Sequence, residues 1–364
     1  MGKPQKYLEG KILQRDCFFE KGEQVHFFDL ENPEDLARIR DPMLAMKNIK
    51  GIIFLDEIQK KPEIFSTLRV LADREESPAK FVVLGSASPH LLKESSESLA
   101  GRIAYYELGG FSVSDVGIAN SGRLWQRGGF PKAYLSSTDS RSFLWRRNFI
   151  RTFLERNLPS FGVDISSETM FRFWTMLAHY HGQIWNASEF GRSFGVADTT
   201  VRNYLDKLAG CFMVRLLKPW HENISKRQVK SVKPFIRDSG IVHNLLGIRS
   251  MEDLERHPKC GASWEGFVIE ELTELFGLDG EDCYFWATHA GLELDLLVVK
   301  GEKKTGFEIK RTSSPKITPS MTNSIEDLNL EQIYLIHCGD HSFDLADKIR
   351  AVAFNQILSE VKNI

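Results

Sequence analysis

Cysteines are few in this sequence, and long apolar runs are missing from it. The five cysteines are scattered over 364 residues, without a CxxC pair or a Cys/His cluster that has the spacing of a zinc site. No stretch approaches the roughly eighteen apolar residues of a membrane span, and the N-terminus has no apolar signal core. These absences exclude a disulfide framework and a structural zinc site, and they predict a cytoplasmic protein that does not enter a membrane.

A strong charge of one sign is also missing. The 47 lysines and arginines nearly balance the 49 acidic residues, which leaves a formal net charge of −2. This balance gives no support for a surface coated in positive charge for nucleic acid, although a local basic patch is compatible with it. The length exceeds that of one ordinary hydrophobic core, so we expect two or three domains.

Short apolar strands alternate with helical patterns in the first third of the sequence. Val25–Leu30, Gly51–Leu55 and Phe81–Leu84 are predicted to be strands. Pro62–Asp73 has apolar residues at helical spacing. This alternation is typical of an α/β fold with a parallel, doubly wound sheet.

Two adjacent carboxylates, Asp56 and Glu57, follow the second of these strands. Parallel strands deliver their C-terminal residues to the crevice where such sheets bind ligands. Asp56 can hold a hydrated Mg²⁺ there, and Glu57 can act as the base that orients an attacking water. After the third strand, Ser86, or alternatively Ser88, can sense a γ-phosphate. The alternative is a pair of solvated acids and an ordinary serine–glycine turn.

Three longer stretches carry a resemblance to a known family. They read IIFLDEIQKKPEIF, VVLGSASPHLLKESSESLAGRIAYYELGGFS and GGFPKAY. With them the chain resembles, over its whole length, a prokaryotic family of AAA-type P-loop ATPases that carry a C-terminal domain of unknown biological role. The resemblance implies ATP and Mg²⁺ as ligands. It also implies that Arg102 can meet a phosphate as an arginine finger does, in the same chain or across a homo-oligomer; a surface salt bridge is the alternative.

The sequence departs from that family at its start. A P-loop reads GxxxxGK[ST], whereas Gly2 and Lys3 match only the tail of this motif. Pro4 stands where a hydroxyl should bind Mg²⁺, and proline has no amide hydrogen for a phosphate. A start placed at an internal methionine and a degraded gene both explain the truncated motif, and Pro4 favours degradation. We expect weak or absent ATP binding, which a titration with micromolar affinity would refute.

The middle of the chain has the order of a winged helix-turn-helix. Asn186 and Glu189 form a predicted capping box for one helix. Asp198 is predicted to cap a second helix over Thr199–Leu208, and the strand Cys211–Leu217 follows. Helix, turn, helix and strand in this order indicate a winged-helix fold.

The outward face of the second helix is a candidate DNA contact. Val201, Leu205 and Leu208 fall on one face, so other side chains point outward. The outward residues that could meet phosphates or base edges are Thr199, Thr200, Arg202 and Asn203. A basic stretch downstream would assist; it contains Lys226, Arg227, Lys230 and Lys233. The alternative is a helical hairpin used for packing or for partner contacts.

Two strands near the C-terminus carry charged residues in a recognisable order. Asp295 opens one strand, and Glu308 and Lys310 close the next on a shared face. Hydrolysis of a phosphodiester needs two carboxylates that hold Mg²⁺ and a lysine that lies beside the developing charge. Glu265 could supply a third acid. This resembles the D…ExK pattern of restriction-nuclease-like folds, which the family's C-terminal domain is expected to share. A solvated hairpin and a retained fold without cleavage are alternatives.

The patterns together predict an α/β protein of three parts. A truncated P-loop AAA-type parallel sheet is expected in residues 1–120, a helical and winged-helix region in 121–240, and an α/β restriction-nuclease-like domain in 241–364 that closes with a helix over Leu345–Val361. The leading hypothesis is an AAA-type ATPase that is impaired in its P-loop and associated with DNA. A second is a nucleic-acid-binding or nuclease module whose ATPase half is a scaffold. A third is a non-catalytic interaction protein, for example in a toxin–antitoxin or defence-like system.

Overall fold

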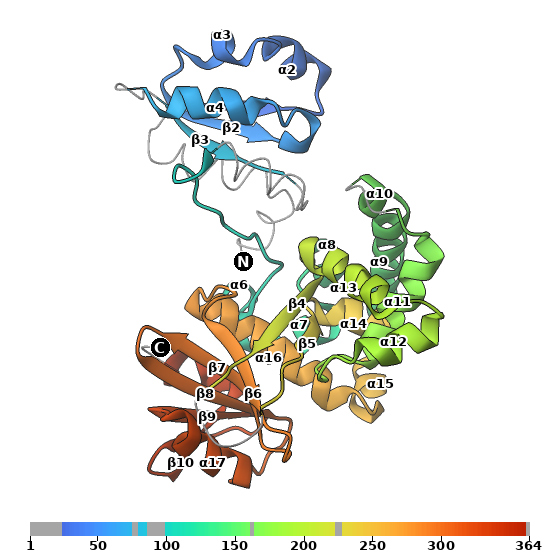
Figure 1. Cartoon of the computed structure of the whole chain (residues 1–364), viewed down its shortest axis with the longest axis vertical. Helices are drawn as coiled ribbons and strands as arrows, with labels where there is room; N and C mark the ends of the chain where they lie inside the picture. Colours follow the sequence, from blue (N-terminus) through green and yellow to red (C-terminus); the bar gives the residue numbers. More distant parts are fainter. Residues whose placement is uncertain (1–23, 75–78, 86–98, 161–163, 223–227, 362–364) are drawn as a thin grey trace. The chain divides into compact units, whose positions relative to one another are not determined.

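The computed structural model describes residues 24–74, 79–85, 99–160, 164–222 and 228–361 (Figure 1). The chain divides into two compact units, residues 1–108 and residues 109–364. Within the described residues, no helix is both long and apolar enough to cross a lipid bilayer.

A parallel sheet forms the centre of the first unit. Its strands are β1 (Val25–Asp29), β2 (Gly51–Asp56) and β3 (Ala79–Val83), and β2 lies between the other two in the described part of the sheet. Every residue of β2 after Gly51 is buried, as expected for a strand with a neighbour on each side. The three predicted strands and their parallel arrangement are confirmed.

Helices connect these strands. The segment between β1 and β2 contains α2 (Pro33–Arg38) and α3 (Pro42–Met46), and the segment between β2 and β3 contains the turn η2 (Ile58–Lys60) and α4 (Ile64–Ala72). Asn32 and Asp41 cap the two short helices through their side chains, and each is followed by a proline at the first helical position. The predicted helix before β3 is confirmed as α4, which buries Phe65, Leu68 and Leu71.

The second unit begins with a helical region. Its helical segments are α6 (Val113–Val116), η3 (Ile118–Asn120), α7 (Ser121–Arg127), α8 (Pro131–Tyr134), α9 (Asp139–Thr152), the π-helical η4 (Phe153–Asn157), α10 (Leu158–Ser160), α11 (Ser167–His179), α12 (Ala187–Phe194), α13 (Asp198–Gly210), α14 (Ser239–Leu245) and α15 (Met251–Arg256). Within this unit, the green and yellow helices of Figure 1 gather at one end and the orange and red strands at the other.

A mixed sheet forms the other half of the second unit. In the described residues its order is β10-β11-β9-β8-β7-β6-β4-β5. The strands are β4 (Val214–Pro219), β5 (Lys233–Ile236), β6 (Cys283–Ala287), β7 (Glu293–Lys300), β8 (Lys303–Lys310), β9 (Gln332–His337), β10 (Phe343–Ala346) and β11 (Ile349–Ala353). The helices and turns that accompany them are α16 (Cys260–Phe276), α17 (Pro319–Leu328), η5 (Phe354–Gln356) and α18 (Ile357–Glu360).

The hairpin of the middle region belongs to the same sheet as the C-terminal strands. β4 pairs with β5 in antiparallel fashion, and its last residues pair with β6 in parallel fashion, Lys218 opposite Tyr284 and Pro219 opposite Phe285. A side chain on β5 can therefore reach the C-terminal strands.

A buried polar network ties three helices of this unit together. His243 Nδ1 lies 3.0 Å from the carbonyl oxygen of Gln126, and its Nε2 lies 2.7 Å from Ser263 Oγ. Trp125 donates its indole N–H to the same hydroxyl. Burial lowers the pKa of His243 to about 3, so the imidazole is neutral. The network therefore joins α7, α14 and α16 through a neutral imidazole.

The predicted closing helix over Leu345–Val361 is wrong. Residues 343–353 form β10 and β11, and only Ile357–Glu360 is α-helical there. β11 lies parallel to β9, with Ile349 opposite Ile333 and Ala353 opposite His337. The hydrogen bonds from β9 stabilise an extended segment that local helical spacing does not reveal.

Replacing Glu271 with glutamine is expected to stabilise the fold increasingly as pH rises. Glu271 on α16 is buried and accepts a hydrogen bond from the Val113 amide, and burial raises its pKa to about 8. Between an unfolded pKa of about 4.5 and the folded value, the native state retains a proton that the unfolded state has lost, so wild-type stability falls with rising pH. The advantage of Glu271→Gln should grow by up to about 4 kcal/mol between pH 5 and 8.

Urea denaturation at several pH values measures this difference. The matched control is Glu274→Gln, on the exposed side of the same helix. An advantage of Glu271→Gln that does not change with pH would show that this carboxyl does not titrate differently on unfolding.

Candidate functional site

The carboxyl end of β2 presents the two predicted acids side by side. Asp56 is the last residue of this strand and is only 4% exposed. Asp29, the last residue of β1, lies opposite it in the ladder. Glu57 follows in the left-handed backbone region, with φ 55° and ψ 44°, a conformation that costs about 1–3 kcal/mol for a residue other than glycine. The strand thus ends in a sharp backbone turn at the second of the two acids.

Local hydrogen bonds hold this turn. Asp56 Oδ1 accepts the backbone N–H of Glu57 at 2.8 Å, and the Gln59 side-chain amide donates to the Glu57 carboxylate. The chain after β3 joins the turn, because Leu84 donates its N–H to the Leu55 carbonyl and accepts the Ile58 N–H. The carboxyl ends of β2 and β3 therefore meet at one edge of the sheet.

Other predicted nucleotide contacts lie elsewhere. Gly2, Lys3, Ser86 and the alternative Ser88 fall outside the described residues. Arg102 forms an ion pair with Asp73 at the surface, and its guanidinium lowers the pKa of that carboxyl.

The position of this ion pair separates Arg102 from Asp56. Asp73 follows α4, a nine-residue helix that starts near the end of β2 and leads back to the start of the parallel strand β3. It therefore lies about 13 Å along the helix from the carboxyl edge. The structure does not bring Arg102 to Asp56 within this unit, and the arrangement matches the surface salt bridge given as the alternative.

The two helices predicted in this region are α12 and α13. Gly195 ends α12 in the left-handed conformation, at φ 66°, and Val201, Leu205 and Leu208 are buried as expected. Of the predicted DNA contacts, Thr199, Arg202 and Asn203 are exposed and Thr200 is half-buried.

Asn186 is the N-cap residue of α12 as predicted, but the predicted capping box is not formed, and α13 begins one residue earlier than predicted, with Ala197 rather than Asp198 as its N-cap. The Asn186 side chain makes no capping hydrogen bond, and Glu189 instead accepts a hydrogen bond from the Tyr180 hydroxyl at 3.3 Å. Asp198 lies inside α13 and accepts a hydrogen bond from Ser188 at 2.7 Å. These side chains stabilise contacts between elements rather than helix ends.

An acidic cluster lies where β7 and β8 pair. Leu296 is opposite Phe307, so Asp295 and Glu308 come next along the ladder. Both are 4% exposed. Lys310 Nζ lies 2.9 Å from Glu308 Oε1 and 3.5 Å from Asp295 Oδ2, and Asp295 also accepts the Ile309 N–H at 2.8 Å. The structure thus brings the three predicted residues together.

The fourth predicted acid, Glu265 on α16, reaches the cluster through a lysine that the sequence pattern did not place there. Lys233 Nζ lies 3.6 Å from Glu265 Oε1 and also pairs with Glu293. Its side chain is only 2% exposed. The expectation that Lys233 joins a basic DNA-binding stretch is therefore wrong. In the sequence, the lysine of the otherwise apolar strand KPFI was the feature that indicated a buried lysine paired with an acid.

The electrostatic environment of this acidic cluster favours the binding of a positively charged group. Burial raises the pKa of Glu308 and of Glu265, and the neighbouring Asp295 carboxylate raises both further. Glu308 Oε2 is buried and has no hydrogen-bond partner in the described structure. An oxygen of this kind beside a second carboxylate fits a divalent cation.

A complete set of protein ligands is not assembled. Within the described ranges, no three side chains of His, Cys, Asp or Glu gather in a way that could hold a metal ion. Glu265 pairs with Lys233 rather than acting as a third ligand. Asp295 and Glu308 are therefore the pair that could hold a cation, with water or substrate completing its coordination.

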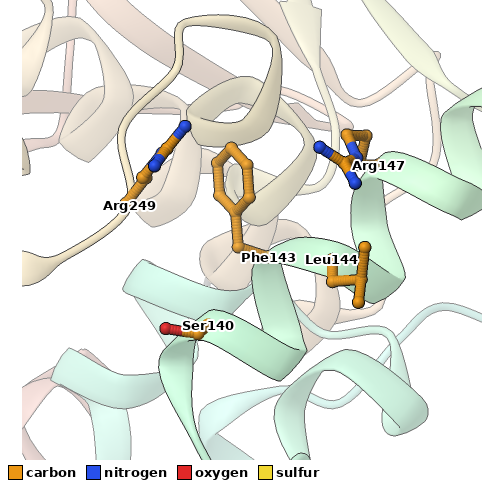
Figure 2. Close-up of a pocket in the computed structure, with 5 residues that line it drawn as sticks. All are labelled: Ser140, Phe143, Leu144, Arg147 and Arg249. Atoms are coloured by element: carbon orange, nitrogen blue, oxygen red, sulfur yellow. The ribbon is translucent and has the colours of Figure 1, made fainter.

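A surface pocket of about 190 Å³ lies in the second unit. Its lining residues are Ser140, Phe143, Leu144, Arg147 and Arg249. Figure 2 shows Phe143 between the side chains of Arg147 and Arg249, and the Arg249 guanidinium lies 5.5 Å from the centre of the Phe143 ring. None of the predicted site residues lines it.

Comparison with known families and proteins finds matches along most of the chain. An AAA domain family matches residues 8–117, and two domains of unknown function match residues 119–252 (DUF8612) and 260–357 (DUF4143). Two curated proteins, the uncharacterized proteins Rv2008c of Mycobacterium tuberculosis and Mb2031c of Mycobacterium bovis, are each 50% identical over 332 residues. The alignment covers 91% of this chain and 75% of each relative.

Proposed function

We propose that this chain, which belongs to the same family as these two uncharacterized mycobacterial proteins and matches an AAA domain family over residues 8–117, binds ATP with Mg²⁺ at the carboxyl end of β2 and hydrolyses it there. The observation that carries the proposal is the position of Asp56 and Glu57. They end a buried strand between two parallel neighbours, where such sheets bind ligands.

The two carboxylates have different tasks in this proposal. Asp56 would hold the metal, because carboxylate oxygen suits Mg²⁺ and the Glu57 amide fixes its other oxygen. When bound, Mg²⁺ would neutralise charge on the phosphates. Glu57 would orient water and accept its proton, in a position set by the left-handed backbone and the Gln59 amide.

Weak nucleotide binding remains part of the proposal. Pro4 offers neither the hydroxyl that holds Mg²⁺ in a P-loop nor an amide hydrogen for phosphate. Phosphate release from ATP by the purified protein tests the activity. No Mg²⁺-dependent release at millimolar ATP would overturn it.

A second function, metal-dependent phosphodiester hydrolysis, is proposed for the acidic cluster. The element order α16-β6-β7-β8-α17-β9, an antiparallel meander followed by a parallel strand, supports a restriction-nuclease-like core. Asp295 and Glu308 would hold Mg²⁺, which when bound would activate water and stabilise phosphate charge. The Lys310 ammonium lies beside both carboxylates, where it could meet charge that develops on a phosphate.

We further propose that the exposed face of α13 contacts DNA phosphates, so that replacing Arg202 with alanine weakens DNA binding similarly for all sequences. Arg202 lies on the exposed face of α13, and the loss of one phosphate contact should lower the slope of log K against log salt by about 1. Fluorescence anisotropy at several salt concentrations measures this slope. Arg256→Ala, on the exposed face of α15, is the control and should leave the slope unchanged. Equal slopes for Arg202→Ala and wild type would show that α13 does not contact DNA through Arg202.

A further inference from the structure

Lys233 differs from the other lysine of the acidic cluster in its freedom to move. The Lys233 side chain is 2% exposed, whereas Lys310 is 47% exposed. Lys233 also lies 5.3 Å from the centre of the Phe285 ring, and its backbone is held opposite Leu217 in the β4–β5 hairpin. Lys310 can therefore swing towards solvent, but Lys233 cannot leave without opening the hairpin.

The charges of the cluster leave room for one divalent cation. The carboxylates are Glu265, Glu293, Asp295 and Glu308, and the ammonium groups are Lys233 and Lys310. With Lys310 displaced towards solvent, the other five groups carry a formal charge of −3 when ionised, and one divalent cation leaves −1. A second divalent cation would leave a charge of +1 beside the buried Lys233 ammonium, which is costly.

We propose that the Lys233 ammonium acts as a permanent cation between Glu265 and Glu293, so that the C-terminal site binds a single divalent cation, at Asp295 and Glu308. This inference rests on the cation site proposed above for the C-terminal core. An ion between Glu265 and Glu293 would have to displace Lys233 and leave its ammonium buried without a partner.

Asp295 and Glu308, the two acids that do not pair with Lys233, can accept an ion. Glu308 is 5% exposed at its side chain, and its Oε2, like Glu265 Oε1, has no hydrogen-bond partner in the described residues. Asp295 comes opposite it in the β7–β8 ladder. An ion that enters between them displaces only the half-exposed Lys310 ammonium.

The number of bound ions tests the proposal. Mn²⁺ is titrated into the full chain without nucleotide and counted from the electron paramagnetic resonance signal of free Mn²⁺. Asp56→Asn is present in every protein, which removes the metal site proposed at β2. We expect one Mn²⁺ per chain when Lys233 is present and two in Lys233→Met. Lys304→Met is the control, because Lys304 also pairs with a glutamate, Glu222, and lies beside an aromatic ring; it should keep one ion.

Thermal unfolding keeps the test decisive if Lys233→Met folds poorly. Its melting temperature should fall without Mn²⁺ and recover when Mn²⁺ is added, whereas the Lys304→Met variant should gain no more from Mn²⁺ than the parent. Two ions in the parent protein, or one ion in Lys233→Met with no recovery, would overturn the role of Lys233 and leave the cation site intact. No bound Mn²⁺ in any variant would overturn the cation site itself.

Discussion

Glu57→Gln is expected to lower ATP turnover by about 10²–10⁴-fold at saturating ATP, the usual contribution of a positioned general base. Glutamine keeps the size of the side chain and can still accept the hydrogen bond from Gln59, but it cannot take a proton from water. The left-handed backbone at residue 57 remains as it is. The rate of phosphate release at millimolar ATP with Mg²⁺ is the measurement, and nucleotide affinity should hardly change.

Glu63→Gln is the matched control for this experiment. Glu63 is an exposed residue at the start of α4, where its side chain makes no capping hydrogen bond. Its replacement removes the same charge a short distance along the chain and should leave turnover within about twofold. Equal rates of phosphate release for Glu57→Gln and wild type would show that Glu57 is not the general base.

Asp295→Asn is expected to abolish Mg²⁺-dependent nicking of supercoiled plasmid, with a rate loss of about 10²-fold or more. A metal contributes several kcal/mol to such a reaction, and each 1.36 kcal/mol corresponds to a factor of ten. Asparagine retains an oxygen for the Ile309 N–H, so the strand pairing should persist while one negative charge is lost from the cluster. Gel electrophoresis of the plasmid over time measures the rate.

The control for Asp295→Asn is Glu281→Gln, which removes an exposed charge just before β6. It should nick at the wild-type rate. Nicking that survives in Asp295→Asn would come from another site or from a contaminating nuclease, and the second proposed function would be withdrawn.

Strand periodicity explains what could be predicted from the sequence. The run before Asp56 is apolar without a break because β2 is buried between neighbours. Glu308 and Lys310 share a face because they are two residues apart on β8. These relations depend on nearby residues along the chain.

Relations between distant segments could not be predicted in this way. The partners of Lys233 lie at Glu265 and Glu293, on elements that meet it only after the β4–β5 hairpin joins the sheet. The segment Ile349–Ala353 becomes a strand because β9 lies beside it. The local spacing of residues does not distinguish a buried lysine ammonium from a solvated one. It also does not distinguish a short helix from a strand that pairs with a segment distant in the sequence.

The central claim is that Asp56 holds the metal of a bound nucleotide at the carboxyl edge of the first sheet. A calorimetric titration of ATP, with and without Mg²⁺, into wild type and Asp56→Asn tests it most directly. We expect weak ATP binding, with a dissociation constant well above micromolar. Mg²⁺ should strengthen this binding in wild type but not in Asp56→Asn. Micromolar affinity in wild type would contradict the weak binding, and an equal effect of Mg²⁺ in both proteins would contradict the role of Asp56.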